Sequence, residues 1–401
     1  NWSDWREAVA EEYNSLIIEH DVWELVDPPA NTNIVGCRWI LAKKFNVDGS
    51  LSKYKARLCA QVSMYGLKQA RKCWYENLHN FLTSQGYRRN SYESCIYTKV
   101  SANGLRTHLS VFFYVDDLVI ASSDTIELQR IKRELAIKYR VSDLGELNSI
   151  LGLKIDRNIM KRTITISQSN FVHEACRKFG LRSFLPVSYP SDSRIDVGNS
   201  NNISAELSFT VHSLARGFNN PTKNHLLAAE HALKYAWWTK DLSLTLGGKI
   251  QLQAFTDSDF CSERQKGRSR AGYVVFLGEG PVLWASRQQH CVALNTSEAE
   301  YVSLRYCTTD VMWLKRMLAD MGYPQDPVII YEDNKGCFHW ANSESVHKAA
   351  RHIHVSFHFV KEMVADQEVI VKLLSTTDQV ADLFFTKSLT GKKFLEFRSC
   401  L

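Results

Sequence analysis

Two adjacent aspartates stand inside an otherwise apolar run of ten residues, Val111–Ile120 (VFFYVDDLVI). A carboxylate costs several kcal/mol to remove from water unless it is paired or protonated. Two neighbouring carboxylates also repel one another, so a buried pair favours a bound cation. The run therefore predicts two short buried strands, with Asp116 and Asp117 as metal ligands at the bend of a hairpin. The alternative is an Asp-containing turn that follows an apolar strand.

The composition is typical of a soluble globular protein, with 45% hydrophobic and 23% charged residues. A length of 401 residues allows two or three domains, each with its own core. No apolar run reaches the roughly 18 residues of a membrane span, and the first residues lack the order of a signal peptide. The ten cysteines form no CxxC pair, which favours reduced thiols in an intracellular protein. Because the chain begins with Asn, we expect a fragment of a longer protein.

The chain is mildly basic, with a net charge of +6, and eight of its cationic residues lie within one stretch of thirty residues. Cations bind phosphates, and interleaved aromatic rings can stack on bases, so this stretch predicts a nucleic-acid surface. The alternative is a solvated basic face. The cations are Lys43, Lys44, Lys53, Lys55, Arg57, Lys68, Arg71 and Lys72, and the aromatic residues are Trp39, Tyr54, Tyr65, Trp74 and Tyr75.

Periodicity places helices and strands along the first half. Apolar residues at helical spacing predict a helix near the N-terminus, followed by a strand over 37–45, a turn at 46–49 and a second strand. Ser123 or Asp124 can cap a helix whose apolar face includes Leu128, Ile131 and Leu135. The Ser-, Asn- and Asp-rich stretch 186–205 predicts a linker or an exposed loop.

The second half alternates strand and helix patterns, which is typical of a small α/β domain. A helix over His225–Tyr235 and a break at Gly247-Gly248 precede it. The expected elements are a strand over 250–257, a hairpin over 273–286 turning at 278–280, a helix from Ser297, a strand over 328–331, a helix after His347, a strand over 368–374 and a last helix from Asp378.

Ten short phrases, taken in order, make the chain resemble the reverse transcriptase–RNase H region of copia-class retrotransposon Pol polyproteins. They are WREAVAEEYNSL, DVWELVDPP, DGSLSKYKARLCA, YGLKQARKCW, YVDD, LGELNSILGLKI, TDSDF, SEAEY, EDN and TTDQVADLFFTKSL. The resemblance implies an α+β palm and fingers remnant followed by an α/β RNase H-like domain. The expected division is 1–185 for truncated fingers and palm, 186–248 for linker and connection or thumb remnant, and 249–401 for the RNase H-like domain.

The same resemblance implies an RNase H site that holds two Mg²⁺ or Mn²⁺ ions on Asp257, Glu300, Asp333 and Asp382. Such hard cations prefer carboxylate oxygens, and two of them can grip a scissile phosphate and activate water. Each acid also has a structural alternative. Ser297-Glu-Ala-Glu300 matches a capping box, Asp333 could cap the next helix, and Asp382 could be a solvated helix residue.

Four histidines crowd one segment, and His354 and His358 have the spacing of metal ligands on a helix. No cysteine or acid motif accompanies them, so we expect a surface helix face. The family usually has Asp where His354 stands, which puts local contacts in doubt. The other two histidines are His347 and His352.

The polymerase site lacks a ligand that the resemblance requires. In the family, a third aspartate from an earlier palm strand bridges the metals, but only Gln61, Val62 and Ser63 separate Ala60 from Met64. Three residues are fewer than one average strand of about five. Because a lost electrostatic group commonly costs 10²-fold or more, we expect no useful DNA synthesis. Weak nucleic-acid or nucleotide binding is still expected at Lys55, Arg57, Gly66, Lys68 and Gln69.

Three functions are therefore open. The first is a decayed element product whose polymerase is inactive and whose RNase H site cuts RNA in RNA–DNA hybrids. The second is a non-enzymatic nucleic-acid-binding remnant, and the third is an active polymerase shortened here by a gene-model error. The expected partners are an RNA–DNA hybrid, an RNA template and DNA, with no membrane. The expected location is intracellular, in the cytoplasm, a virus-like particle or the nucleus.

Overall fold

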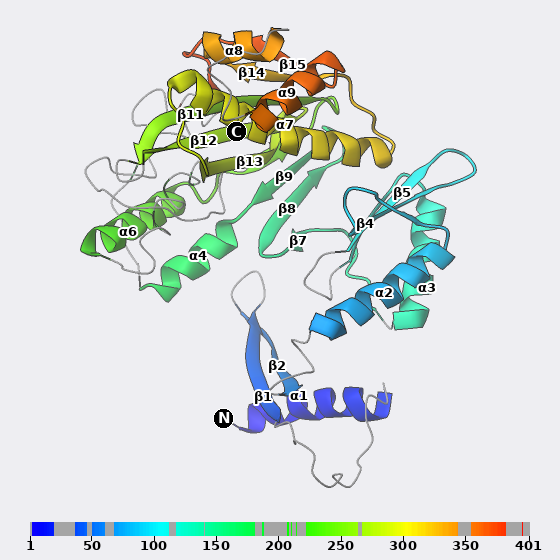
Figure 1. The fold of residues 1–401 in the computed structure, drawn as a ribbon. Helices are drawn as coiled ribbons and strands as arrows, with labels where there is room; N and C mark the ends of the chain where they lie inside the picture. Colours follow the sequence, from blue (N-terminus) through cyan, green and yellow to red (C-terminus); the bar gives the residue numbers. More distant parts are fainter. Residues whose placement is uncertain are drawn as a thin grey trace, which may run out of the picture. The chain divides into compact units, whose positions relative to one another are not determined.

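The computed structural model divides the chain into two compact units, 1–139 and 140–401. Each unit has its own buried cluster of apolar side chains. Figure 1 shows the elements in the order of the chain. The structure describes residues 2–19, 37–45, 50–60, 68–111, 118–139, 141–180, 187, 207, 210, 214, 222–263, 267–343, 354–381 and 395.

The first unit begins with helix α1, Ser3–Asn14, which ends in a π-helical turn, η1, Ser15–Glu19. An antiparallel hairpin follows, formed by β1, Cys37–Phe45, and β2, Leu51–Ala60. The ring of Trp5 on α1 packs edge-on against Tyr54 of β2, with ring centroids 4.6 Å apart. The predicted helix and the two strands are confirmed, whereas the turn at 46–49 lies outside the described residues.

The rest of this unit is a four-stranded antiparallel sheet with two helices. Its strands lie in chain order, so each pairs with the next. Leu78 and Leu82 of the first helix meet Ile131 and Leu135 of the second in one core, as the apolar spacing predicts. The elements are α2 Lys68–Ser84, β3 Arg88–Arg89, β4 Ile96–Val100, β5 Arg106–Val111, β6 Leu118–Ser122 and α3 Thr125–Tyr139.

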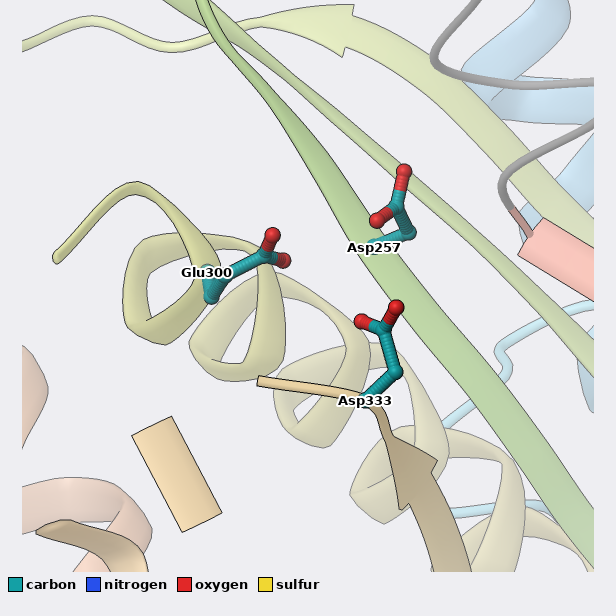
Figure 2. A group of neighbouring side chains, drawn as sticks. All are labelled: Asp257, Glu300 and Asp333. Atoms are coloured by element: carbon teal, nitrogen blue, oxygen red, sulfur yellow. The ribbon is translucent and has the colours of Figure 1, made fainter. Parts of the chain in front are cut away.

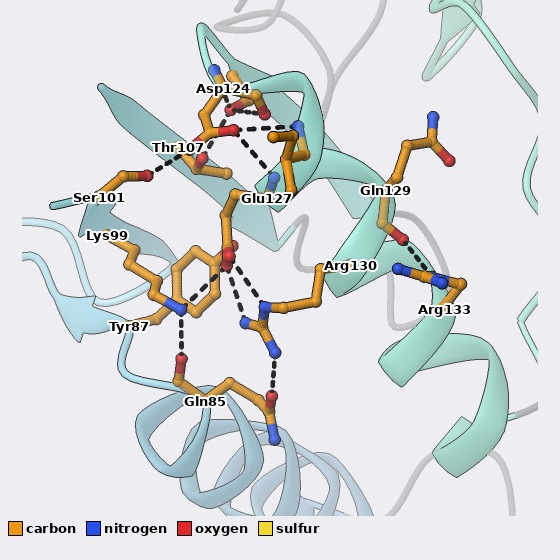
Figure 3. Close-up of polar contacts among 12 residues, drawn as sticks. Gln85, Tyr87, Lys99, Ser101, Thr107, Asp124, Glu127, Gln129, Arg130 and Arg133 are labelled. Atoms are coloured by element: carbon orange, nitrogen blue, oxygen red, sulfur yellow. Dashed lines mark hydrogen bonds and ion pairs between the residues drawn. The ribbon is translucent and has the colours of Figure 1, made fainter. Parts of the chain in front are cut away.

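A buried carboxylate ties helix α3 to this sheet (Figure 3). Glu127 accepts hydrogen bonds from the Arg130 guanidinium at 2.8 Å, the Tyr87 hydroxyl at 2.9 Å and Lys99 Nζ at 3.1 Å. The hydrogen bonds from Arg130, and then those from Tyr87 and Lys99, lower the pKa of Glu127 to about 2 despite its burial. Asp124 Oδ1 accepts from the backbone N–H of Glu127 at 3.0 Å, so Asp124 caps α3 as predicted.

The second unit starts with a small antiparallel sheet in the order β10-β9-β8-β7. Helix α6 contains the predicted helix His225–Tyr235, and β10 follows it to pair with β9. The linker stretch 186–205 lies outside the described residues, apart from Val187. The elements are β7 Ser149–Ile150, β8 Leu153–Asn158, β9 Thr163–Ser167, α4 Ser169–Lys178, α6 Lys223–Trp238 and β10 Leu244–Leu246.

A five-stranded sheet in the order β13-β12-β11-β14-β15 forms the centre of the second unit. The first three strands form an antiparallel meander, and the last two run parallel to β11. Parallel strands need long crossovers, which helices supply here. This arrangement is the RNase H-like α/β fold that was predicted. The elements are β11 Leu252–Glu263, β12 Arg268–Leu277, β13 Gly280–Gln288, α7 Thr296–Asp320, β14 Val328–Glu332, α8 Lys335–Asn342, α9 His354–Ala365 and β15 Val369–Leu373.

Both faces of the five-stranded sheet are covered. Helices α7, α8 and α9 pack on one face around a core that includes Leu304, Val311 and Ile330. Tyr235 of α6 and the pair Val380–Ala381 pack on the other face. Strand β12 is consequently buried along most of its length, as expected of a strand between two layers.

Two sequence-based predictions concern the whole chain rather than one element. Within the described ranges, no helix has both the length and the apolarity that crossing a membrane requires. The cysteines that the structure describes carry free thiols, which are Cys95, Cys176, Cys261, Cys291, Cys307 and Cys337.

Candidate metal centre

Three carboxylates from three elements converge at one place in the second unit (Figure 2). Asp257 lies in β11, Glu300 in the second turn of α7, and Asp333 directly after β14. One carboxylate oxygen of each lies within 4.8 Å of the other two. Asp257 and Glu300 are 3% and 7% exposed, so the cluster is largely removed from water. The structure thus brings together three of the four acids predicted for the nuclease site.

The capping alternatives for Glu300 and Asp333 are wrong. The N-cap of α7 is Asn295, whose side chain accepts from the backbone N–H of Glu298 at 3.0 Å. Glu298 in turn accepts from the backbone N–H of Leu294 at 2.8 Å, which completes the cap two residues before the predicted one. The N-cap of α8 is Asn334 rather than Asp333. Neither Glu300 nor Asp333 is therefore needed to cap the N-terminus of α7 or α8.

Side-chain hydrogen bonds fix the backbone beside Asp257. Ser303, one turn after Glu300 on α7, donates to the carbonyl oxygen of Asp257 at 2.8 Å. Gln379 Nε2 donates to the carbonyl oxygen of Thr256 at 2.9 Å. Both Ser303 and Gln379 are fully buried, so these bonds are shielded from water. The strand that carries Asp257 is thereby held to the helix that carries Glu300.

An acid that sequence reasoning missed, Glu332, lies close enough to the cluster for its charge to act on Glu300. It is fully buried, and its Oε1 accepts from the backbone N–H of Asn334 at 3.1 Å. Along β14, Val328, Ile330 and Glu332 alternate as the buried positions, so Glu332 occupies a place where the pattern requires an apolar residue. That alternation was visible in the sequence and could have indicated a buried acid.

Burial and mutual repulsion make this cluster electrostatically unfavourable when all its acids are ionised. Burial raises the pKa of Glu300 well above its usual value, and the neighbouring charges of Glu332, Asp257 and Asp333 raise it further. Burial likewise raises the pKa of Glu332, as do Asp333 and Asp257. Acids in this position favour either a retained proton or a bound cation.

The donor set of this cluster is of the kind that a hard cation prefers. Oε2 of Glu300 and Oε2 of Glu332 are buried without a hydrogen-bond partner in the described part of the chain. Buried acceptors of this kind normally find a partner. Carboxylate oxygens are the ligands that Mg²⁺ and Mn²⁺ prefer, and the described group within ligand reach of one another consists of carboxylates alone.

The remaining predicted site residues are not all placed. Asp116, Asp117, Gly66 and Asp382 lie outside the described residues, and so do His347 and His352. Lys68 and Gln69 are in the first turn of α2, and His354 begins α9, but their side chains are not described. Lys55 and Arg57 lie on β2 and are partly exposed, and His358 is exposed on α9 as expected.

Comparison with known proteins finds similarity across both units. A family model described as reverse transcriptase (RNA-dependent DNA polymerase) matches residues 61–192. The chain is 26% identical to the retrovirus-related Pol polyprotein from transposon RE1 of Arabidopsis thaliana, over an alignment that covers 98% of this chain. The chain resembles copia-class retrotransposon Pol polyproteins over most of its length. It is also 29% identical, over 83% of its length, to the Pol polyprotein from transposon TNT 1-94 of Nicotiana tabacum.

The copia-class relatives are longer than this chain in two ways. The chain covers 33% of the RE1 polyprotein and 27% of the TNT 1-94 polyprotein. The RE1 alignment runs over 494 positions although the chain has 401 residues, so the relative contains positions that this chain lacks. Among solved structures, LC11-RNase H1 from compost matches 33% of this chain and 91% of its own, with 15% identity and a TM-score of 0.27.

Proposed function

We propose that the C-terminal domain is a metal-dependent ribonuclease that cuts RNA in RNA–DNA hybrids. The observation that carries this proposal is the convergence of Asp257, Glu300 and Asp333 within 4.8 Å on an RNase H-like sheet. Retrotransposon reverse transcriptase and RNase H-like ancestry supports the choice of substrate. Duplexes of this kind are recognised mostly by shape and backbone, so we expect slight sequence preference.

In the proposed mechanism, Asp257, Glu300 and Asp333 would hold two Mg²⁺ or Mn²⁺ ions, with Asp382 as a fourth ligand. Bound divalent cations would polarise the scissile phosphate and lower the pKa of an attacking water. The chain itself supplies fixed geometry, because Ser303 and Gln379 hold β11 beside α7 and the segment before Asp382. It also supplies a site from which water is largely excluded, which strengthens every charge interaction there.

We propose further that the first unit no longer synthesises DNA. Support comes from the three residues between Ala60 and Met64, where the family has a strand with a metal-binding aspartate, and from the positions that the RE1 alignment leaves unmatched. The proposed division remains 1–185 for fingers and palm, 186–248 for linker and connection, and 249–401 for the nuclease domain. A missing exon in the gene model is the competing explanation, and transcript sequencing across Gln61–Val62 decides between them.

A second candidate function is nucleic-acid binding without catalysis. The β1–β2 hairpin favours it, because Lys43 and Lys53 are exposed on neighbouring strands and Tyr54 lies beside them. Lys43 Nζ is 5.3 Å from the centre of the Tyr54 ring, an arrangement in which a cation and an aromatic face lie together. Such a pair suits a phosphate and a base.

Cleavage of a labelled RNA–DNA hybrid tests the nuclease proposal. The full chain is incubated with hybrid and Mg²⁺ and compared with Asp333→Asn and with Glu362→Gln, which removes an exposed acid from α9 of the same domain. We expect cutting by the wild type and by Glu362→Gln, and a loss of at least about 100-fold in Asp333→Asn. If all three proteins bind the hybrid but their cutting is equal and negligible, the nuclease proposal is wrong and nucleic-acid binding without catalysis is favoured.

A further inference from the structure

A hydrogen bond joins the helix of Glu300 to the loop of Asp333. Ser297 lies in the first turn of α7, three residues before Glu300, and Asn334 directly follows Asp333. Ser297 Oγ donates to Asn334 Oδ1 at 3.0 Å. The donor and the acceptor are thus each close in the chain to one acid of the cluster. This hydrogen bond therefore joins the two segments that carry Glu300 and Asp333.

Asn334 is itself held by two further bonds, so it is a fixed point rather than a mobile acceptor. Its Oδ1 also accepts from the backbone N–H of Cys337 at 3.0 Å, which caps α8. Its backbone N–H donates to Glu332 Oε1 at 3.1 Å. Asn334 therefore joins α7 and α8 through its side chain and the end of β14 through its backbone N–H.

Glycine at position 336 allows this close approach. A Cβ added to Gly336 would lie 2.2 Å from Ser297 Oγ and 3.0 Å from Ser297 Cβ. The hydroxyl would have to rotate away from Asn334 to relieve the first contact, which would break the hydrogen bond. The hydrogen bond between Ser297 and Asn334 therefore depends on the absence of a side chain at residue 336.

A second serine on the same helix, Ser303, makes a hydrogen bond to the backbone of Asp257. Ser303 donates to the carbonyl oxygen of Asp257, so it sets α7 relative to β11. Ser297 sets α7 relative to the segment after β14. The two serines, six residues apart on α7, lie on either side of Glu300 along the helix. Together they join the helix that carries Glu300 to the segments that carry the two aspartates.

We propose that Ser297 is a positioning residue, which through Asn334 holds Glu300 and Asp333 at the separation that a shared divalent cation requires. This inference rests on the proposed metal-dependent function. Ser297 does not itself contact the cation, and its role is to keep a ligand in place. Residues that orient metal ligands typically change metal affinity by 10- to 100-fold when they are mutated.

Calorimetric titration of the full chain with Mn²⁺ tests the proposal. The variants are Ser297→Ala, which removes the hydroxyl, and Thr296→Ala, which removes an exposed hydroxyl from the neighbouring position of the same turn. We expect Ser297→Ala to weaken Mn²⁺ binding by roughly tenfold while its urea midpoint without metal stays near that of Thr296→Ala. Thr296→Ala should bind Mn²⁺ as the wild type does.

Gly336→Ala and the double variant Ser297→Ala/Gly336→Ala provide an independent readout. Gly336→Ala should weaken Mn²⁺ binding at least as much as Ser297→Ala, because the new Cβ displaces the hydroxyl. When Ser297→Ala is already present, the same change should have a smaller effect, because the closest contact has been removed. Additive effects, or unchanged Mn²⁺ affinity in Ser297→Ala, would overturn the positioning role while the metal site stands. A wild type that binds no Mn²⁺ would overturn the metal site itself.

Discussion

Replacing Glu300 by Gln should stabilise the folded chain in metal-free buffer. The wild-type carboxyl is buried among three other acids, and both burial and repulsion raise its pKa well above the usual value of 4.5. A carboxyl whose pKa is raised on folding binds more protons in the folded than in the unfolded state. Stability is therefore lost as the pH rises above 4.5, and glutamine removes this loss because it does not ionise.

The upper limit of the effect is the free-energy cost of keeping the Glu300 carboxyl protonated at pH 7. Keeping a carboxyl of unfolded-state pKa 4.5 protonated at pH 7 costs about 3.4 kcal/mol, at about 1.4 kcal/mol for each pH unit. A single pair of charges 4.8 Å apart repels by about 3.5 kcal/mol at an effective dielectric constant of 20, which is the same order. We expect Glu300→Gln to gain up to about 3 kcal/mol of folding stability at pH 7 and little at pH 4.5.

Urea unfolding of the wild type and Glu300→Gln with EDTA, at pH 7 and pH 4.5, measures this difference. Glu362→Gln is the matched control, because it removes the same charge from an exposed position and should change stability little. Excess Mn²⁺ at pH 7 should reduce or reverse the advantage, because the wild type gains a ligand that the variant has lost. A Glu300→Gln variant no more stable than the wild type at pH 7 without metal would refute the reasoning.

Three further outcomes are expected. Glu127→Gln should destabilise the first unit by about 3 kcal/mol at pH 7. The pKa of Glu127 is about 2 in the folded state and about 4.5 in the unfolded state, so its ionised carboxylate stabilises the fold above pH 4.5, and this stability is lost as the pH falls toward 2. Urea unfolding followed by circular dichroism measures the difference. Primer extension on an RNA template should show no nucleotide incorporation by the wild type. Extension above background would contradict the proposed loss of polymerase activity. Lys55→Ala/Arg57→Ala should reduce the slope of log affinity for single-stranded RNA against log salt by about 1 to 2, and an unchanged slope would exclude these phosphate contacts.

Local patterns predicted the elements of the fold well where they were strongly periodic. The strand over 37–45 has the same bounds in the structure, and the hairpin of β12 and β13 turns where the two glycines predicted it. Helix α3 begins after Asp124 because that side chain accepts backbone N–H groups, which is a purely local event. Such features depend on residues within a few positions of one another and are therefore visible in the sequence.

The start of α7 shows where local reasoning failed. Asn295-Thr-Ser-Glu298 and Ser297-Glu-Ala-Glu300 both have the residue types of a capping box, and they overlap by two residues. The structure caps α7 at Asn295, and Glu298 accepts a hydrogen bond from the backbone N–H of Leu294. Residue types alone do not distinguish the two, because the choice depends on how the preceding loop approaches the helix.

The convergence of the site could be anticipated from the family resemblance but not from local pattern. Asp257 and Asp333 meet because β14 pairs with β11, and this pairing joins strands more than seventy residues apart. Gln379 bonds the carbonyl of Thr256 across 123 residues. Interactions at such separations leave no periodic signal in either segment. The buried Glu332 is the exception, because its alternation with Val328 and Ile330 is local.

Anomalous diffraction from crystals of the full chain soaked in Mn²⁺ tests the central claim most directly, because it locates the metal without reference to activity. We expect anomalous density between Asp257, Glu300 and Asp333, with the unpaired oxygen of Glu300 turned toward it. Occupied manganese positions elsewhere in the crystal, with no density among these three carboxylates, would contradict the account.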